Sequence, residues 1–93
     1  MNVSEVLNKA ADLIEEKGWV QEAFSNRYGY CAIGAIRECI WGKDVPSNSP
    51  ELWDGAIERL VKTVREAHIP SWNDAEGRTK EEVIAKLREA ANS

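Results

Sequence analysis

The sequence is poor in the residues that bind metals or form disulfides. Its 93 residues include one histidine and two cysteines, too few to converge as the ligands of a zinc site. Cys31 and Cys39 are eight positions apart in one expected helix, so about 12 Å separates them along its axis. A disulfide spans roughly 7 Å at most. We therefore expect no metal, no cofactor and no intramolecular disulfide.

Long apolar runs and blocks of basic residues are missing as well. The longest stretch without a charged residue runs from Tyr28 to Ile36, far short of the roughly 20 residues that span a membrane. Glu5, Lys9 and Asp12 interrupt the early apolar positions, which argues against a secretory leader. The formal net charge is −4, and no basic block can neutralise phosphates. These absences favour a cytoplasmic protein that contacts neither membrane nor nucleic acid.

The most informative segment that is present runs from Cys31 to Ile36, with the sequence Cys-Ala-Ile-Gly-Ala-Ile. No polar side chain follows until Arg37 and Glu38, so a helix over this segment has to be enclosed by the rest of the domain. Gly34 in its interior costs about 1 kcal/mol relative to alanine. This cost indicates that another backbone or an aromatic ring approaches closely at this position.

Local signals define the first and last helices. Asn2 or Ser4 can cap the first helix, with Glu5 in capping-box register after Asn2. Gly18 supplies the stop of this helix in a left-handed conformation. A second capping box, Thr79-Lys-Glu-Glu82, begins the last helix.

The middle of the chain carries a third set of signals. Ser49-Pro50-Glu51 combines an N-cap, a proline at the first helical position and an acid in the first turn. Pro70 excludes helical geometry at Ile69 and ends that helix near Ala67. We therefore predict an all-α fold for one domain over residues 1–93. It is a compact four-helix domain with a short buried second helix, and its helices cover about residues 4–17, 30–41, 50–67 and 79 to the C-terminus.

The connections between these helices are predicted less directly. Residues 19–29 are interpreted as a packed loop with at most one helical turn, and residues 43–48 as a polar connection. Residues 71–78 form a third loop, which contains Trp72-Asn73-Asp74. Asn and Asp after a proline-terminated helix most often shape a turn through bonds to the neighbouring backbone. The functional alternative is a polar binding patch on a rigid loop.

Five segments together carry a family resemblance. They are Ala10-Ala-Asp-Leu-Ile14, Gly18-Trp19, Cys31-Ala-Ile-Gly-Ala-Ile36, Trp72-Asn-Asp74 and Gly77-Arg-Thr-x-x-Glu-Val-Ile84. In this order they resemble a family of small uncharacterised all-helical proteins from actinobacteria and the phages that infect them. The resemblance implies a helical fold and a phage-related setting, and it implies no activity.

The four tryptophans, at positions 19, 41, 53 and 72, each lie at a helix end or in an adjoining connection. If the helices run antiparallel in sequence, Trp19 and Trp72 lie at one end of the domain and Trp41 and Trp53 at the other. Such rings usually close the ends of a small core. We expect Trp72 to keep an exposed edge, and we select Trp72, Asn73 and Asp74 as the candidate partner-binding residues.

The residues offer one possible nucleophile–base pair, Cys31 with His68. A cysteine in the first turn of a helix has its thiolate favoured by the helix dipole. The simpler interpretation is a small buried apolar residue and a helix-end imidazole. No orienting third group or oxyanion hole is recognisable, so we do not expect an enzyme.

The prediction is therefore a small cytoplasmic protein-binding module, a phage or phage-derived accessory protein whose partner is an unidentified protein, possibly from the host. It is expected to be a monomer or a homodimer. The alternative is a small enzyme or ligand-binding domain in which Cys31 or the Trp72-Asn73-Asp74 loop lines a pocket. A nucleic-acid-binding regulator is disfavoured, because Glu58 and Glu66 interleave with the basic residues of the third helix.

Overall fold

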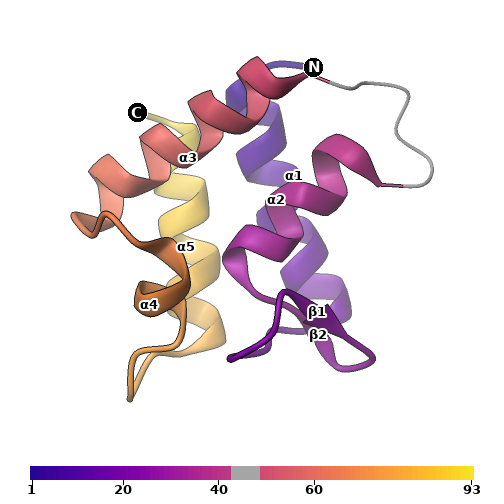
Figure 1. The fold of residues 1–93 in the computed structure, drawn as a ribbon, viewed down its shortest axis with the longest axis vertical. Helices are drawn as coiled ribbons and strands as arrows, with labels where there is room; N and C mark the ends of the chain where they lie inside the picture. The colour runs from indigo at the N-terminus through magenta and orange to yellow at the C-terminus, as the bar shows by residue number, and fades with distance from the viewer. Residues whose placement is uncertain (43–48) are drawn as a thin grey trace.

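A computed structural model of the protein describes residues 1–42 and 49–93. These residues form five helices and a two-stranded antiparallel sheet (Figure 1). The predicted connection over residues 43–48 lies outside the described residues. The elements are α1 Val3–Lys17, β1 Ser25–Asn26, β2 Gly29–Tyr30, α2 Ala32–Trp41, α3 Pro50–Val64, α4 Ile69–Asn73 and α5 Lys80–Ala91.

The helices pack in two layers. α1 lies beside α5 and packs more extensively against it than against any other element, while α2 covers α1 and α3 covers α5 (Figure 1). The Ser4 hydroxyl joins three of these helices, because it donates to the Ala91 carbonyl oxygen at 2.7 Å and accepts from Arg59 at 2.8 Å. Among the described residues, no helix is long and apolar enough to cross a membrane.

The expected start of α1 is confirmed. Asn2 is the N-cap, its side chain accepts from the Glu5 N–H, and the Glu5 carboxylate accepts from the Asn2 N–H. Gly18 ends the helix with a φ of 111°, which is positive as expected, but its ψ of 168° places it outside the left-handed helical region.

The prediction that α2 is deeply enclosed is also confirmed. Seven of its ten residues are buried, including all of Ala32 to Ile36. A Cβ atom on Gly34 would collide with the carbonyl oxygen of Phe24, so the glycine marks a close backbone approach. The helix begins later than predicted: Tyr30 belongs to β2 and Cys31 is the N-cap.

A β-hairpin replaces the loop predicted over residues 19–29. β1 pairs with β2 around Arg27 and Tyr28, and Trp19 forms a parallel bridge to Tyr30 on the other side. Gly29 has a φ of 146°, and a Cβ atom there would collide with the backbone of Gly18. This glycine contact holds the hairpin against the end of α1.

The region after α3 differs from the prediction. α3 ends at Val64, because Arg65 adopts a left-handed conformation with a φ of 59°. Pro70 does not end a helix. It lies in the first turn of α4. A backbone N–H in this turn has no partner within the helix, so the proline removes no hydrogen bond. Trp72 and Asn73 therefore belong to the short helix α4 instead of a loop, and the described residues form five helices where four were predicted.

Caps at the remaining helix starts are confirmed in part. Thr79 caps α5 by accepting from the Glu82 N–H at 3.1 Å. The Glu82 carboxylate does not return to Thr79, because it pairs with Arg78 at 2.7 Å. Ser49 precedes Pro50 as expected, but its hydroxyl donates to Glu51 at 2.9 Å and does not cap α3.

Candidate functional site

The predicted binding residues Trp72 and Asn73 lie inside the protein. Trp72 is 6% exposed and Asn73 is fully buried, so the expectation that Trp72 keeps an exposed edge is wrong. Asp74 is exposed, and its carboxylate accepts from the Glu22 N–H at 2.9 Å. A partner therefore cannot reach Trp72 or Asn73 in this structure.

Asn73 uses every hydrogen-bonding position of its side chain. Its oxygen accepts from the Trp19 indole N–H at 2.8 Å and from the Ala32 N–H at 3.0 Å. Its amide nitrogen donates to the Val20 carbonyl oxygen at 3.1 Å and to the Asp74 carboxylate at 3.0 Å. We call these five residues the Asn73 node. The node joins α4 to the segment after α1 and to the start of α2.

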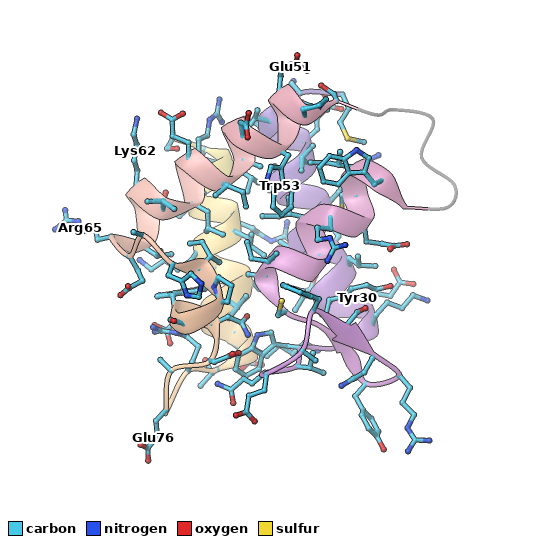
Figure 2. All side chains as sticks on the ribbon, viewed as in Figure 1. Tyr30, Glu51, Trp53, Lys62, Arg65 and Glu76 are labelled. Atoms are coloured by element: carbon cyan, nitrogen blue, oxygen red, sulfur yellow. The ribbon has the colours of Figure 1, made fainter. Side chains whose placement is uncertain are left out.

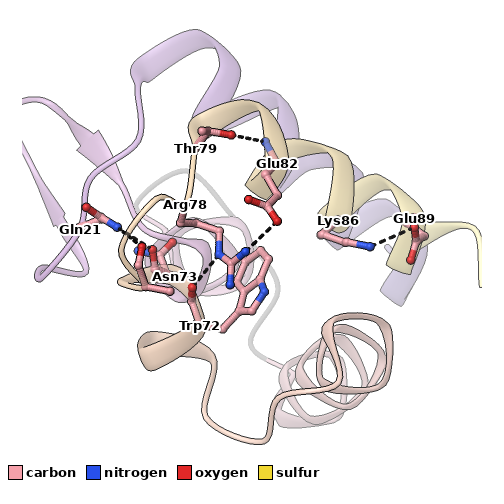
Figure 3. Close-up of polar contacts among 9 residues, drawn as sticks. Gln21, Trp72, Asn73, Arg78, Thr79, Glu82, Lys86 and Glu89 are labelled. Atoms are coloured by element: carbon pink, nitrogen blue, oxygen red, sulfur yellow. Dashed lines mark hydrogen bonds and ion pairs between the residues drawn. The ribbon is translucent and has the colours of Figure 1, made fainter.

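Arg78 connects the region of the Asn73 node to α5 (Figure 3). Its guanidinium carbon lies 4.4 Å from the centroid of the Trp72 ring, and its Nε donates to the Trp72 carbonyl oxygen at 2.8 Å. The same side chain pairs with Glu82, and from the other side Gln21 donates to the Asn73 carbonyl oxygen at 3.2 Å. The hydrogen bonds and the stacked guanidinium assign this region a structural role.

The second tryptophan pair is exposed on one side. The ring centroids of Trp41 and Trp53 are 5.4 Å apart with planes tilted by 38°, which confirms that these two rings lie together. Trp53 is partly buried at the interface of α2 and α3 (Figure 2). Trp41 is 43% exposed, so it and not Trp72 is the tryptophan that presents a surface.

A groove of about 380 Å³ begins at Trp41 and runs along α2 toward the hairpin. The exposed Phe24 and the partly buried Tyr30 form its hairpin end. α2 contributes residues spaced i, i+3, i+4 and i+7, which share one face of a helix. We call this surface the α2 groove; its lining is Phe24, Ser25, Tyr30, Gly34, Arg37, Glu38 and Trp41.

The α2 groove contains one cation and one anion. The Arg37 guanidinium carbon lies 5.1 Å from the centroid of the Phe24 ring, which is cation–π distance. Neither Arg37 nor Glu38 forms an ion pair within the described part of the chain. Both charges are therefore available to a group that enters the groove.

Both cysteines are buried, which agrees with the simpler interpretation of Cys31 as a small buried residue. The Cys31 sulfur caps α2 by accepting from the Gly34 N–H at 3.2 Å. Burial raises the pKa of the Cys31 thiol, and the nearby Asp74 charge acts in the same direction. Burial likewise raises the pKa of Cys39 to about 11. The alternative of a dipole-stabilised thiolate at Cys31 finds no support, because desolvation outweighs the bonds that favour the thiolate.

The proposed base partner of Cys31 is engaged elsewhere. His68 caps α4, and its Nδ1 lies 2.7 Å from the Ser71 hydroxyl. Cys31 does line a smaller hollow of about 290 Å³ together with Asp74, so the structure brings together two of the residues named in the alternative prediction. Over residues 1–42 and 49–93, no group of three or more His, Cys, Asp or Glu side chains is arranged to hold a metal ion.

Sequence reasoning missed the α2 groove. Its hairpin side depends on Phe24, whose position follows from a hairpin that was not predicted. Its helical side was visible, because Arg37, Glu38 and Trp41 are the exposed residues of an otherwise buried helix. The signal that could have found it is the charged and aromatic stripe that interrupts the apolar pattern of α2.

The chain belongs to a family of unknown function (DUF6197), whose model matches residues 1–93. No curated protein matches the chain significantly, and no solved structure does so either. The family match agrees with the resemblance to uncharacterised small proteins and adds no activity to it.

Proposed function

We propose that this protein is a protein-binding module that acts through the α2 groove and not by catalysis. One observation carries the proposal: Phe24 and Trp41, 51% and 43% exposed, stand at the two ends of a single groove. Arg37 lies between them. Aromatic residues and arginine dominate the energetics of protein interfaces, so this groove has the composition of a binding site.

The groove is held in place before any partner arrives. The Phe24 carbonyl oxygen accepts from the Cys31 N–H at 3.0 Å, which fixes the hairpin to the start of α2. At the other end Trp41 stacks on Trp53. Exposed rings on a rigid base lose little conformational freedom on binding, which favours affinity.

The thiol chemistry supports binding over catalysis. A nucleophilic cysteine needs its thiolate, and burial keeps Cys31 protonated at neutral pH. The phage or phage-derived setting inferred from the sequence resemblance, with a cytoplasmic location, completes the proposal. In that setting the protein acts by occupying a surface of another polypeptide.

A site-specific photo-crosslinker tests this function in cells. Ser25 lines the groove with an exposed, small side chain, so benzoylphenylalanine replaces it with little loss of contact. Lys62, exposed on α3 away from the groove, is the matched control position (Figure 2). Irradiation is expected to give a discrete protein adduct from position 25 and none from position 62.

A second variant assigns that adduct to the groove. Adding Trp41→Ala to the Ser25 crosslinker removes one end of the groove and is expected to remove the adduct. If position 25 gives no adduct, or if both positions give the same adducts, the α2 groove is not a protein-binding surface. Melting curves measured by circular dichroism check that each variant is folded.

A further inference from the structure

We propose that the polypeptide bound by the α2 groove is a second copy of this chain, in a two-fold symmetric dimer with the two α2 helices packed antiparallel. This inference rests on the proposed function and names the partner of the same site. A two-fold interface requires a surface that complements itself. The stripe that α2 presents to the groove has this property.

The register of the stripe supplies the geometric argument. Its positions, Gly34, Arg37, Glu38 and Trp41, are spaced symmetrically about the point between Arg37 and Glu38. An axis at that point, perpendicular to the helix, places each Arg37 opposite Glu38 of the second copy. The same axis places Trp41 opposite Gly34 of the second copy. Within one helix these two positions are seven residues, or about 10 Å, apart. One rotation therefore produces both pairs.

Charge favours the same arrangement. Arg37 and Glu38 form no ion pair within the described part of the chain, and together they give the groove no net charge. The whole chain carries −4, so two copies repel each other weakly at a distance. Two Arg37–Glu38 pairs across the axis offset this repulsion and also fix the orientation of the copies, as complementary charges do at interfaces.

Shape brings Trp41 against the hairpin end of the groove of the second copy. There Phe24 covers Gly34, because its carbonyl oxygen occupies the space that a side chain on Gly34 would fill. The indole from the second copy therefore meets the exposed Phe24 ring, on which Arg37 already lies, and not the α2 backbone. Such aromatic pairs contribute to an interface beyond the area that they bury.

Charge reversal tests the register. Arg37→Glu places two acidic stripes against each other, and Glu38→Arg places two basic stripes against each other. We expect each single variant to weaken self-association roughly tenfold or more, measured by sedimentation equilibrium. An equimolar mixture of the two variants restores association, because acidic and basic stripes then face each other. The double variant Arg37→Glu/Glu38→Arg restores it as a homodimer.

The control changes the same charge on another face. Arg65→Glu alters an exposed arginine at the end of α3 (Figure 2) and is expected to leave the association constant unchanged. A wild-type chain that stays monomeric at the highest soluble concentration overturns the second-copy proposal. Failure of the mixture to associate, with both variants folded, overturns it as well.

The crosslinking experiment separates this inference from the function on which it rests. An adduct at position 25 with twice the mass of the chain supports the second copy. An adduct with a different protein, from a chain that is monomeric by sedimentation, overturns the second copy and retains the proposed function. Absence of any adduct at position 25 overturns the proposed function itself.

Discussion

The two tryptophan pairs of this protein are used in opposite ways. At the Asn73 node, Trp19 donates its indole N–H to a buried amide, and the neighbouring Trp72 is covered by Arg78. At the α2 groove, Trp53 supports Trp41, and nearly half of the Trp41 side chain faces solvent. Both regions place aromatic rings at helix ends, but the rings of one are covered and the other keeps part of Trp41 at the surface.

The difference separates the region that stabilises the fold from the region that we propose binds a partner. A buried polar side chain stabilises a structure only when its partners are complete, and Asn73 meets this condition with its four side-chain bonds. An exposed ring contributes less to stability and remains available for contact. The node can therefore hold the fold while the groove stays free for a partner.

The largest expected effect comes from opening the node. Asn73→Leu keeps a similar volume but removes the acceptor of the Trp19 and Ala32 N–H groups and the donor to Val20. Each buried group left without a partner costs about 1–3 kcal/mol. We expect the free energy of unfolding to fall by at least about 3 kcal/mol, measured by urea denaturation.

Asp74→Asn is the matched control for this substitution. Its side-chain oxygen can still accept from the Glu22 and Asn73 N–H groups, so a change within about 0.5 kcal/mol is expected. If Asn73→Leu were as mild as Asp74→Asn, the node would not be what holds this end of the domain, and the contrast with the groove would be lost.

The second effect concerns the contact that joins the two regions. Gly34→Ala forces a Cβ atom against the Phe24 carbonyl oxygen, which also accepts from the Cys31 N–H. We expect a loss of about 1–3 kcal/mol through overpacking, read from the midpoint of thermal unfolding. Ala35→Gly, at a buried site of the same helix, separates this clash from helix propensity. A neutral Gly34→Ala would contradict the close backbone approach.

The third effect concerns the N-terminal cap of α5, which lies beside Arg78 and outside the Asn73 node. Thr79→Ala removes the side-chain cap of α5 next to Arg78, and a loss of about 0.5–2 kcal/mol is expected in urea denaturation. Thr79→Ser retains the hydroxyl and should keep most of the stability. Equal losses in the two variants would mean that the cap bond is unimportant.

A smaller effect is expected on the groove side. Trp41→Ala removes one ring of the pair with Trp53, and such aromatic pairs contribute about 0.5–1.5 kcal/mol beyond the area they bury. Because more than half of Trp41 is also covered, we expect a stability loss somewhat above this range but below that of Asn73→Leu, together with complete loss of groove-dependent crosslinking. A loss as large as that of Asn73→Leu would place Trp41 among the structural rings and remove the distinction between the regions.

The smallest effect concerns pH and the two thiols. Burial raises the pKa of Cys31 and raises that of Cys39 from 9.0 to about 11. A group whose pKa is higher in the folded state stabilises the fold below its unfolded pKa and loses that contribution as pH rises through the folded value. The stabilisation from Cys39 should therefore be complete below pH 9 and lost by about pH 11.

The rate of thiol labelling tests whether burial keeps the two thiols protonated and covered. Cys31→Ser and Cys39→Ser leave one thiol each, and the remaining thiol should react with iodoacetamide much more slowly than free cysteine at pH 8. Rapid labelling of Cys39→Ser, in which only Cys31 remains, would restore the case for a nucleophilic Cys31.

Features set by neighbouring residues were predictable from the sequence. Asn2 and Thr79 cap helices because a side chain three residues before a backbone N–H is close enough to accept from it. Ser49 shows that a local competitor, here the Glu51 carboxylate, can take the hydroxyl instead. The burial of α2 followed from the lack of a polar face between Ala32 and Ile36. Gly34 signalled a close contact, although the sequence did not say that Phe24 makes it.

Features set by distant residues were not predictable in this way. The strands of the hairpin are two residues each, too short for an alternating pattern, and Gly29 owes its conformation to Gly18 eleven positions earlier. Trp72 is buried because residues far along the chain surround it: the Trp19–Asn73 bond joins residues 54 positions apart. Pro70 is compatible with either end of a helix, and only the fold decides which applies.

The pairing of α1 with α5 has a consequence for protein synthesis. α1 is synthesised before α5, the element that it contacts most extensively, and the Ser4 hydroxyl finds its Ala91 acceptor only after α5 has been synthesised. Until then the apolar face of α1 lacks its main cover, and contacts between such distant segments form slowly. We therefore expect folding of these residues to be completed only after α5 has left the ribosome, and the exposed apolar face of α1 favours aggregation until then.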